Sequence, residues 1–200
     1  MNKNQGYNQE LFLEPGNMLR LYARGAFPMA DEKTGEINWY LPEIRTIIPL
    51  KNYNFPRSLR KVMDKTDYEI RYDFDFLSVV KACADREKTW ISEELIKAYL
   101  RLFSLKHIHT VEIYKQNKLI GGLYGVSFRG AFFGESMFSR ISQASKIALI
   151  KLIEHLNEKK FTLLDVQYMT PHLKMFGAQE ISFEEYNRLL LLAYQSDVEF

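Results

Sequence analysis

Residues 121–140, GGLYGVSFRGAFFGESMFSR, constrain the fold more than any other part of the chain. Apolar and aromatic residues fill two short segments on either side of Arg129-Gly130, which is typical of two antiparallel strands joined by a turn. The polar pair Glu135-Ser136 is predicted at the end of the second strand. A helix predicted from Ser142 and a strand over Phe161 to Gln167 follow. Strands, helix and strand in this order indicate an α+β fold with polar side chains at strand ends.

An earlier strand extends this part of the sheet. Residues 110–114 alternate in pattern, and Gln116-Asn117 forms a turn into a strand over residues 118–127. With residues 131–134, we expect a three-stranded antiparallel meander. Gly121 and Gly122 weaken the central strand, so they mark either a bulge or a backbone that a ligand approaches closely, and both explanations stay open.

The chain changes character near residue 65. Five of the six prolines lie before it, in an irregular region, whereas the later residues follow regular strand and helix patterns. We therefore predict a small N-terminal α/β domain over residues 1–65. A second domain over residues 66–200 would hold a central, mostly antiparallel sheet.

Composition limits the class of protein without naming it. The net charge of +2 allows a nucleic-acid partner but does not require one. The single cysteine, Cys83, excludes an internal disulfide and fits a reducing compartment. The N-terminal sequence MNKNQGYNQE lacks the apolar segment of a signal peptide, and no apolar run approaches the ~18 residues of a membrane span. We expect a soluble cytoplasmic protein, and a monomer by default.

Several chemistries are not supported by motifs. The four histidines lack metal-ligand spacing, and no nucleophile elbow or phosphate-binding loop is present. What remains is Glu135 with Asp165 and Gln167, which a period of two places on one face of their strand. A carboxylate at a strand end can accept a proton from an amine, and a neighbouring amide can orient the reacting group.

A basic segment occupies residues 51–61, KNYNFPRSLRK, in which Lys51, Arg57, Arg60 and Lys61 occur without an acidic residue. It is either a phosphate-contacting patch or the solvated face of a helix. Charge alone favours the solvated face.

A series of segments then carries a family resemblance. They are YARGAFP (Tyr22–Pro28), FPRSLRK (Phe55–Lys61), CADREKTWI (Cys83–Ile91), HTVEIY (His109–Tyr114), GGLYGV (Gly121–Val126), GESMFSR (Gly134–Arg140), ASK (Ala144–Lys146), LDVQ (Leu164–Gln167) and HLKMFGAQEI (His172–Ile181). Through them the chain resembles the bacterial leucyl/phenylalanyl-tRNA–protein transferases. GESMFSR followed by Asp-x-Gln is highly specific for that family.

The resemblance implies a C-terminal domain with an N-acetyltransferase-like (GNAT) fold behind a smaller N-terminal domain. It implies transfer of Leu, Phe or Met from aminoacyl-tRNA to the N-terminal Arg or Lys of a protein, which then enters N-end rule degradation. It implies no metal and no small cofactor.

The resemblance also implies roles for individual residues. Asp165 and Gln167 match the catalytic pair, which we expect to orient and deprotonate the attacking amine, and Glu135 with Ser136 would lie near the incoming peptide. The pocket for the amino-acid side chain would consist of Trp90, Leu123, Phe132, Met137, Leu149, Leu152 and Leu164, with Tyr22 and Met29 as further substrate-binding residues. Arg57, Arg60 and Lys61 match the patch that contacts the tRNA acceptor stem.

The chain departs from the family in two ways. Met29 stands where the family usually has a tryptophan, with Trp39 nearby, and the N-terminal region is shorter than is common. One alternative is a GNAT-type N-acyltransferase that uses acyl-CoA, but its glycine-containing pyrophosphate loop is absent from the SRISQASK segment at residues 139–146. A non-catalytic module that binds tRNA or peptide is the other alternative, although it would not need both Asp165 and Gln167.

Overall fold

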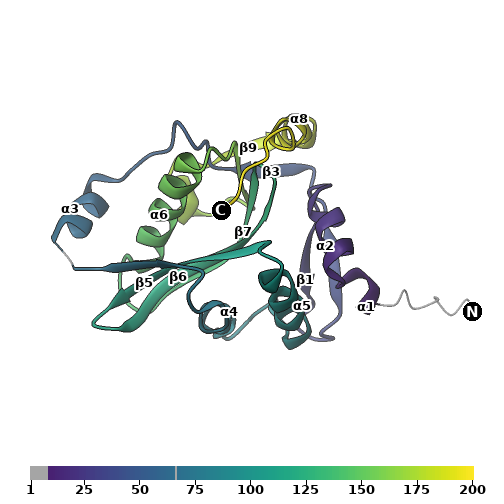
Figure 1. Ribbon diagram of the computed structural model, residues 1–200, viewed down its shortest axis with the longest axis horizontal. Helices are drawn as coiled ribbons and strands as arrows, with labels where there is room; N and C mark the ends of the chain where they lie inside the picture. The colour runs from purple at the N-terminus through teal and green to yellow at the C-terminus, as the bar shows by residue number, and fades with distance from the viewer. Residues whose placement is uncertain (1–8, 66) are drawn as a thin grey trace, which may run out of the picture.

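The computed structural model describes residues 9–65 and 67–200 (Figure 1). The helices are α1 (Gln9–Phe12), α2 (Pro15–Tyr22), α3 (Arg57–Lys65), α4 (Phe76–Ala84), α5 (Glu93–Ser104), α6 (Ala144–Glu158), α7 (Pro171–Lys174) and α8 (Phe183–Ala193). The strands are β1 (Phe27–Ala30), β2 (Ile37–Tyr40), β3 (Ile44–Ile47), β4 (Glu69–Tyr72), β5 (Ile108–Lys115), β6 (Lys118–Phe128), β7 (Ala131–Ser139), β8 (Leu163–Gln167) and β9 (Gln179–Ser182). The predicted absence of a signal peptide concerns residues that lie mostly outside the described ones.

One mixed sheet of seven strands organises the molecule, in the order β4-β5-β6-β7-β8-β3-β9. The strands β4 to β7 form an antiparallel series, so the predicted meander is confirmed. β8 joins β7 in parallel after the crossover through α6, and this pairing covers three residue pairs, from Ala131–Leu163 to Phe133–Asp165. The α+β class is therefore confirmed.

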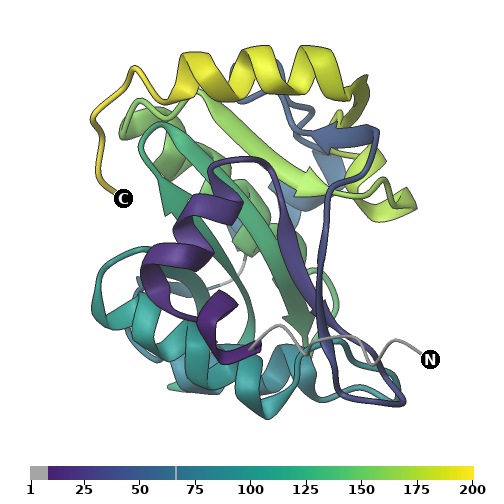
Figure 2. The same cartoon turned by 90° about the vertical axis from the view of Figure 1, so that its right-hand side faces the viewer.

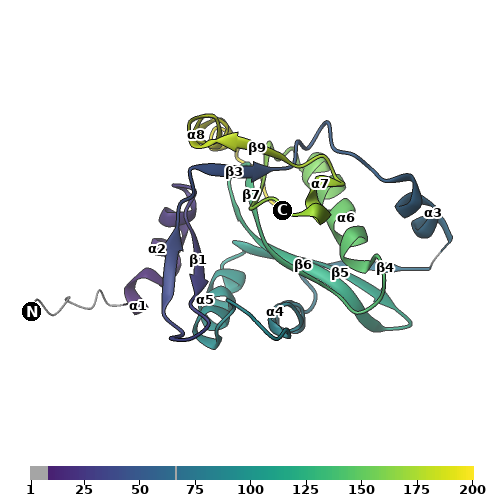
Figure 3. The same cartoon turned by 180° about the vertical axis from the view of Figure 1, so that it is seen from behind.

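Helices cover both faces of this sheet, α6 on one side and α4 with α5 on the other (Figures 1 and 3). Neighbouring residues of each strand alternate between the two hydrophobic layers. Phe132 and Leu164 pack with α6, whereas Phe133 and Leu163 pack with α4 and α5. A central strand buried on both faces explains why these segments are almost continuously apolar.

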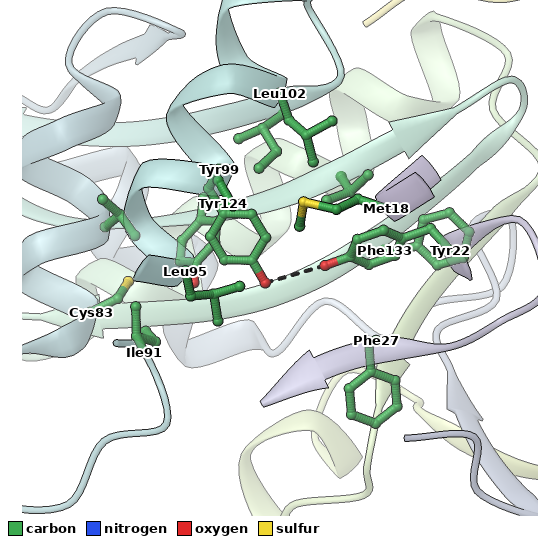
Figure 4. Close-up of a cluster of buried hydrophobic side chains, with 14 of the residues drawn as sticks. Met18, Tyr22, Phe27, Cys83, Ile91, Leu95, Tyr99, Leu102, Tyr124 and Phe133 are labelled. Atoms are coloured by element: carbon green, nitrogen blue, oxygen red, sulfur yellow. Dashed lines mark hydrogen bonds between the residues drawn. The ribbon is translucent and has the colours of Figure 1, made fainter. Parts of the chain in front are cut away.

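The hairpin of β1 and β2 lies beside α2 at one end of the sheet (Figure 2). Met18, Tyr22 and Phe27 from this region share one buried cluster with Leu95 and Tyr99 of α5 (Figure 4). The N-terminal elements therefore contribute side chains to the same core as the large sheet.

Ser92 caps α5, because its hydroxyl accepts a hydrogen bond from the Leu95 amide at 3.2 Å. The strand predicted to end at Gly134 instead continues to Ser139, so Glu135 and Ser136 lie within β7 rather than at its end.

The two strand glycines have a packing explanation. A Cβ on Gly121 would lie 2.5 Å from the Cβ of Ala144, and one on Gly122 would lie 2.9 Å from the Val111 carbonyl oxygen. The pairing of β5 and β6 also shifts register beside Gly121. The register shift supports the bulge, which is one of the two explanations left open by the sequence, and the backbone of these glycines packs closely against α6 and β5.

β3 lies before the predicted domain boundary yet pairs with both β8 and β9 in the large sheet. The boundary itself falls at residue 66, outside the described residues, and stays a prediction.

Candidate active site

A cavity of about 590 Å³ opens between β7, β8, the first half of α6 and the segment after α4. Many of the predicted site residues line it: Trp90, Leu123, Glu135, Ser136, Met137, Leu149, Leu152, Leu164 and Gln167. Its wall is mainly aliphatic and aromatic, and Glu135 and Gln167 are among its polar residues. The fold thus brings together residues from five separate segments of the sequence.

Glu135 is the buried acid of this cavity, with 8% of its surface exposed. Its Oε1 accepts hydrogen bonds from the Tyr22 hydroxyl at 3.0 Å and the Gln167 Nε2 at 3.1 Å. Its Oε2 accepts one from the Tyr99 hydroxyl at 2.8 Å. The two tyrosine hydroxyls lie 3.2 Å apart (Figure 4). Tyr22 of α2 and Tyr99 of α5 therefore both donate to one carboxylate on β7.

Burial raises the pKa of Glu135 to about 7, because the carboxylate loses its water. The hydrogen bonds from Tyr99 and Tyr22 oppose this shift, and the nearby Asp165 carboxylate adds to it. Burial, together with the charge of Glu135, also raises the pKa of both tyrosines well above its usual value, so they remain donors.

Gln167 ends β8 with a positive φ of 64°. An extended strand would place the side chains of Asp165 and Gln167 on the same face. The positive φ breaks that geometry, so the Gln167 side chain does not follow the direction of the Asp165 side chain. Its Nε2 donates to Glu135, and its backbone amide donates to the Asp165 Oδ1 at 2.8 Å. Asp165 therefore holds the backbone of Gln167 while the amide side chain lies at the cavity.

Asp165 is fully buried and paired with Arg45 of β3, which is 1% exposed. The Arg45 Nε donates to both carboxylate oxygens at 3.0 Å, and the Tyr186 hydroxyl donates to Oδ2 at 2.7 Å. The guanidinium also lies between two rings, 4.7 Å from the centroid of Phe27 and 4.8 Å from that of Tyr186. Burial opposes the charge of Arg45, but the attraction of Asp165 outweighs it and raises the pKa of the guanidinium.

The remaining predicted catalytic and substrate-binding residues do not line the cavity. Asp165 is behind Gln167, Tyr22 reaches the site through Glu135, and Phe132 is buried between the sheet and α6. Met29 is half-buried on β1, opposite Asn38 of β2, and packs against the core.

The basic residues of the 51–61 segment occupy a separate helix. Arg57, Arg60 and Lys61 are exposed on α3, at the end of the molecule opposite α2 (Figure 1). The Arg60 guanidinium lies 4.6 Å from the centroid of the Phe55 ring. Leu59 of the same helix is buried and fixes its inner face.

Sequence reasoning missed Arg45, Tyr99 and Tyr186. Arg45 interrupts an apolar strand, IRTI, and a charge in such a strand is a sign of a buried partner, though not of which partner. Tyr99 lies at helical spacing with Leu95 and Leu102, which predicts burial but not the contact of its hydroxyl.

A larger cavity of about 780 Å³ lies elsewhere, beside Asp73, His109, Ser127 and Phe200, and none of the predicted site residues lines it. We place the candidate active site at the smaller cavity, because the polar groups and the predicted lining residues meet there.

Comparisons with known proteins agree on one family. The family model described as leucyl/phenylalanyl-tRNA protein transferase matches residues 47–191, and the model for the N-terminal domain of that family matches residues 13–43. A curated protein of Salinibacter ruber, named leucyl/phenylalanyl-tRNA–protein transferase, is 42% identical over 181 residues, covering 90% of this chain and 80% of the relative.

Solved structures show weaker likeness. A conserved protein of unknown function from Staphylococcus epidermidis matches with a TM-score of 0.44 and 12% identity over 70% of this chain and 57% of the other. The C-terminal domain of a putative lysylphosphatidylglycerol synthetase from Agrobacterium fabrum matches with a TM-score of 0.42 and 14% identity over 93% of this chain and 63% of the other. Within residues 9–65 and 67–200, no helix is both long and apolar enough to cross a bilayer.

Proposed function

Because the chain belongs to the leucyl/phenylalanyl-tRNA–protein transferase family, we propose that its 590 Å³ cavity is the place where aminoacyl-tRNA and the acceptor protein meet. The protein is an aminoacyltransferase whose substrates are an aminoacyl-tRNA and a protein. One observation supports this location of the active site: Glu135 and Gln167 line the same cavity as the predicted apolar residues.

The apolar part of the cavity binds the side chain of the transferred amino acid. Leu149 and Leu152 of α6 face it together with Met137 of β7. Unbranched and γ-branched side chains such as Met, Leu and Phe suit a lining of this kind, whereas stiff β-branched ones fit it less easily. This supports Leu, Phe and Met as the amino acids transferred.

Of the predicted catalytic pair, Gln167 is the catalytic residue at the cavity and Asp165 is its positioning residue. The Gln167 amide lies at the cavity wall, where it orients the attacking amine. Asp165 acts from behind by holding the backbone of Gln167. Aminolysis of an aminoacyl ester is downhill, so the positioning of amine and ester supplies much of the catalysis.

The charge of Glu135, beside Ser136, favours an acceptor protein that begins with Arg or Lys.

Arg57, Arg60 and Lys61 contact the phosphates of the tRNA acceptor stem from α3. Such contacts read the backbone rather than the bases, so the identity of the tRNA matters little and salt matters much. Tyr22, through its hydrogen bond to Glu135, and Met29 are further substrate-binding residues.

The finer description of the fold is GNAT-like. It is supported by the register shift between Tyr124 and Gly125 of β6 and by the short parallel pairing of β7 with β8. The protein acts as a cytoplasmic monomer, without a metal or small cofactor, and its products are substrates of the N-end rule pathway.

The proposal is tested by transfer of radiolabelled leucine or phenylalanine from charged tRNA onto peptides that begin with Arg, Lys, Asp, Glu or Ala. Wild type is compared with Asp165→Ala and with the control Asp197→Ala, whose side chain is 96% exposed. We expect label on the Arg and Lys peptides with wild type and the control, and loss of label with Asp165→Ala while tRNA binding is kept. Label on acidic peptides instead would contradict the assigned specificity.

A further inference from the structure

We propose that Glu135, rather than Asp165, accepts the proton that the attacking α-amine must lose. This inference rests on the proposed function, because it names the proton acceptor of the same reaction. It follows from what surrounds each carboxylate.

The carboxylate of Asp165 has no free position for a proton or an amine. Its Oδ1 accepts from the Arg45 Nε and from the Gln167 amide. Its Oδ2 accepts from the Arg45 Nε and Nη2 and from the Tyr186 hydroxyl. A carboxylate has about four acceptor positions, and these contacts occupy them. Asp165 also lies behind the cavity wall, so it is a positioning residue.

The carboxylate of Glu135 differs in each of these respects. It lines the cavity, and its Oε2 accepts a single hydrogen bond, from Tyr99. Its Oε1 accepts from Tyr22 and Gln167, which fix the orientation of the group and leave Oε2 with a free lone pair. An amine oriented by the Gln167 amide is therefore next to the one carboxylate of the cavity wall that has room for a proton.

Glu135 also has a suitable proton affinity. Its pKa of about 7, raised by burial, lies close to the reference value of ~8 for an α-amine. Proton transfer between groups of nearly matched affinity near neutral pH is the condition under which a general base is most effective. The groups that face it are Tyr22 of α2, Arg45 of β3, Tyr99 of α5, Tyr124 of β6 and Asp165 of β8, with Arg86 and His172 on the same cavity wall.

The α-ammonium of the acceptor gives one proton to Glu135 and becomes a neutral amine. The amine nitrogen attacks the ester carbonyl, the C–N bond forms, and the bond from the carbonyl carbon to the ribose oxygen breaks. One of the two protons left on nitrogen passes to the departing ribose oxygen. The proton on Glu135 returns to water when the products leave.

The experiment measures kcat/KM for an Arg peptide from pH 5.5 to 9.5 with wild type, Glu135→Gln, Asp165→Asn and the control Asp197→Asn. In wild type and the control, the rate should rise with an apparent pKa near 7. In Glu135→Gln it should fall about a hundredfold at pH 6.5, and the rise should move to the amine's own pKa of ~8, with a smaller defect at pH 9. Asp165→Asn should be slower but keep a rise close to pH 7, moved to somewhat lower pH because the Asp165 carboxylate contributes to the raised pKa of Glu135.

A second variant, Tyr99→Phe, tests the inference even if Glu135→Gln does not fold. Tyr99→Phe removes a hydrogen bond that lowers the pKa of Glu135, so the rise in rate should move to higher pH while the carboxylate remains. Transfer with an unchanged pH profile in both Glu135→Gln and Tyr99→Phe would overturn the inference and leave the proposed function standing. Loss of the rise near pH 7 in Asp165→Asn alone would overturn it too. Absence of transfer by wild type at every pH would overturn the proposed function and the inference together.

Discussion

Arg45 of β3 and Asp165 of β8 form a buried ion pair across 120 residues of sequence, with the Arg45 Nε 3.0 Å from both carboxylate oxygens. The pair joins the neighbouring strands β3 and β8. It also fixes Asp165, whose carboxylate holds the backbone of Gln167 beside the cavity. It links the stability of the sheet to the geometry of the site.

Replacement of Arg45 should therefore be costly. Arg45→Met leaves the Asp165 carboxylate buried without its partner, and we expect a loss of about 3–5 kcal/mol in the free energy of unfolding. The exposed pair of Arg188 and Glu185 on α8 provides the control, because Arg188→Gln should cost less than about 1 kcal/mol. Urea unfolding of the three proteins measures both values. Equal small losses would show that the buried pair contributes no more than a surface one.

The raised pKa of Glu135 makes stability depend on pH. A carboxyl group whose pKa is about 7 in the folded state and ~4.3 in the unfolded state stabilises the fold below pH ~4 relative to higher pH. This contribution is lost as the pH rises through 7. We expect the unfolding free energy of wild type to fall by about 2–3 kcal/mol more than that of Glu135→Gln between pH 5 and pH 8. Denaturant titrations at the two pH values measure the difference, and parallel losses in both proteins would contradict it.

The contact between α6 and β6 leaves no room for a methyl group at Gly121. Gly121→Ala places a Cβ 2.5 Å from that of Ala144, so α6 must shift at the end that leads to the cavity. We expect a loss of about 1–3 kcal/mol in stability, together with lower transfer activity. Gly16→Ala is the matched control, since its Cβ would meet nothing within 4 Å on α2, and it should be neutral or stabilise by up to about 1 kcal/mol. Thermal melting with activity assays separates the two outcomes.

The basic face of α3 should determine how tRNA binding responds to salt. Replacing Arg57, Arg60 and Lys61 by Ala should weaken binding of different tRNAs alike. It should also lower the slope of log affinity against log salt by about 2–3. Arg129→Ala, an exposed substitution outside α3, serves as the control. A loss confined to one tRNA species would indicate base recognition instead.

The parts of the structure that depend on nearby residues could be predicted from the sequence. The cap at Ser92 and the strands on either side of Arg129-Gly130 follow from local hydrogen bonds and turns. The α+β class and most lining residues of the cavity followed from these patterns and from the family resemblance.

What could not be predicted depends on contacts between distant segments or on backbone conformation. No local sequence pattern indicates that β3 pairs with β8 and β9, so Asp165 could not be predicted as the partner of Arg45. The positive φ of Gln167 is likewise not visible in a strand pattern, and it decides which of Asp165 and Gln167 lies at the cavity.

The place of β3 between β8 and β9 has a consequence for the order of synthesis. β3 leaves the ribosome early, but its two neighbours end at Gln167 and Ser182, so its edges stay unpaired while most of the chain is made. Long-range strand pairing is slow, and unpaired strand edges attract other chains. The Arg45–Asp165 pair, and with it the active site, can assemble only after β8 has emerged, so a nascent chain cannot carry out aminoacyl transfer before Gln167 has left the ribosome.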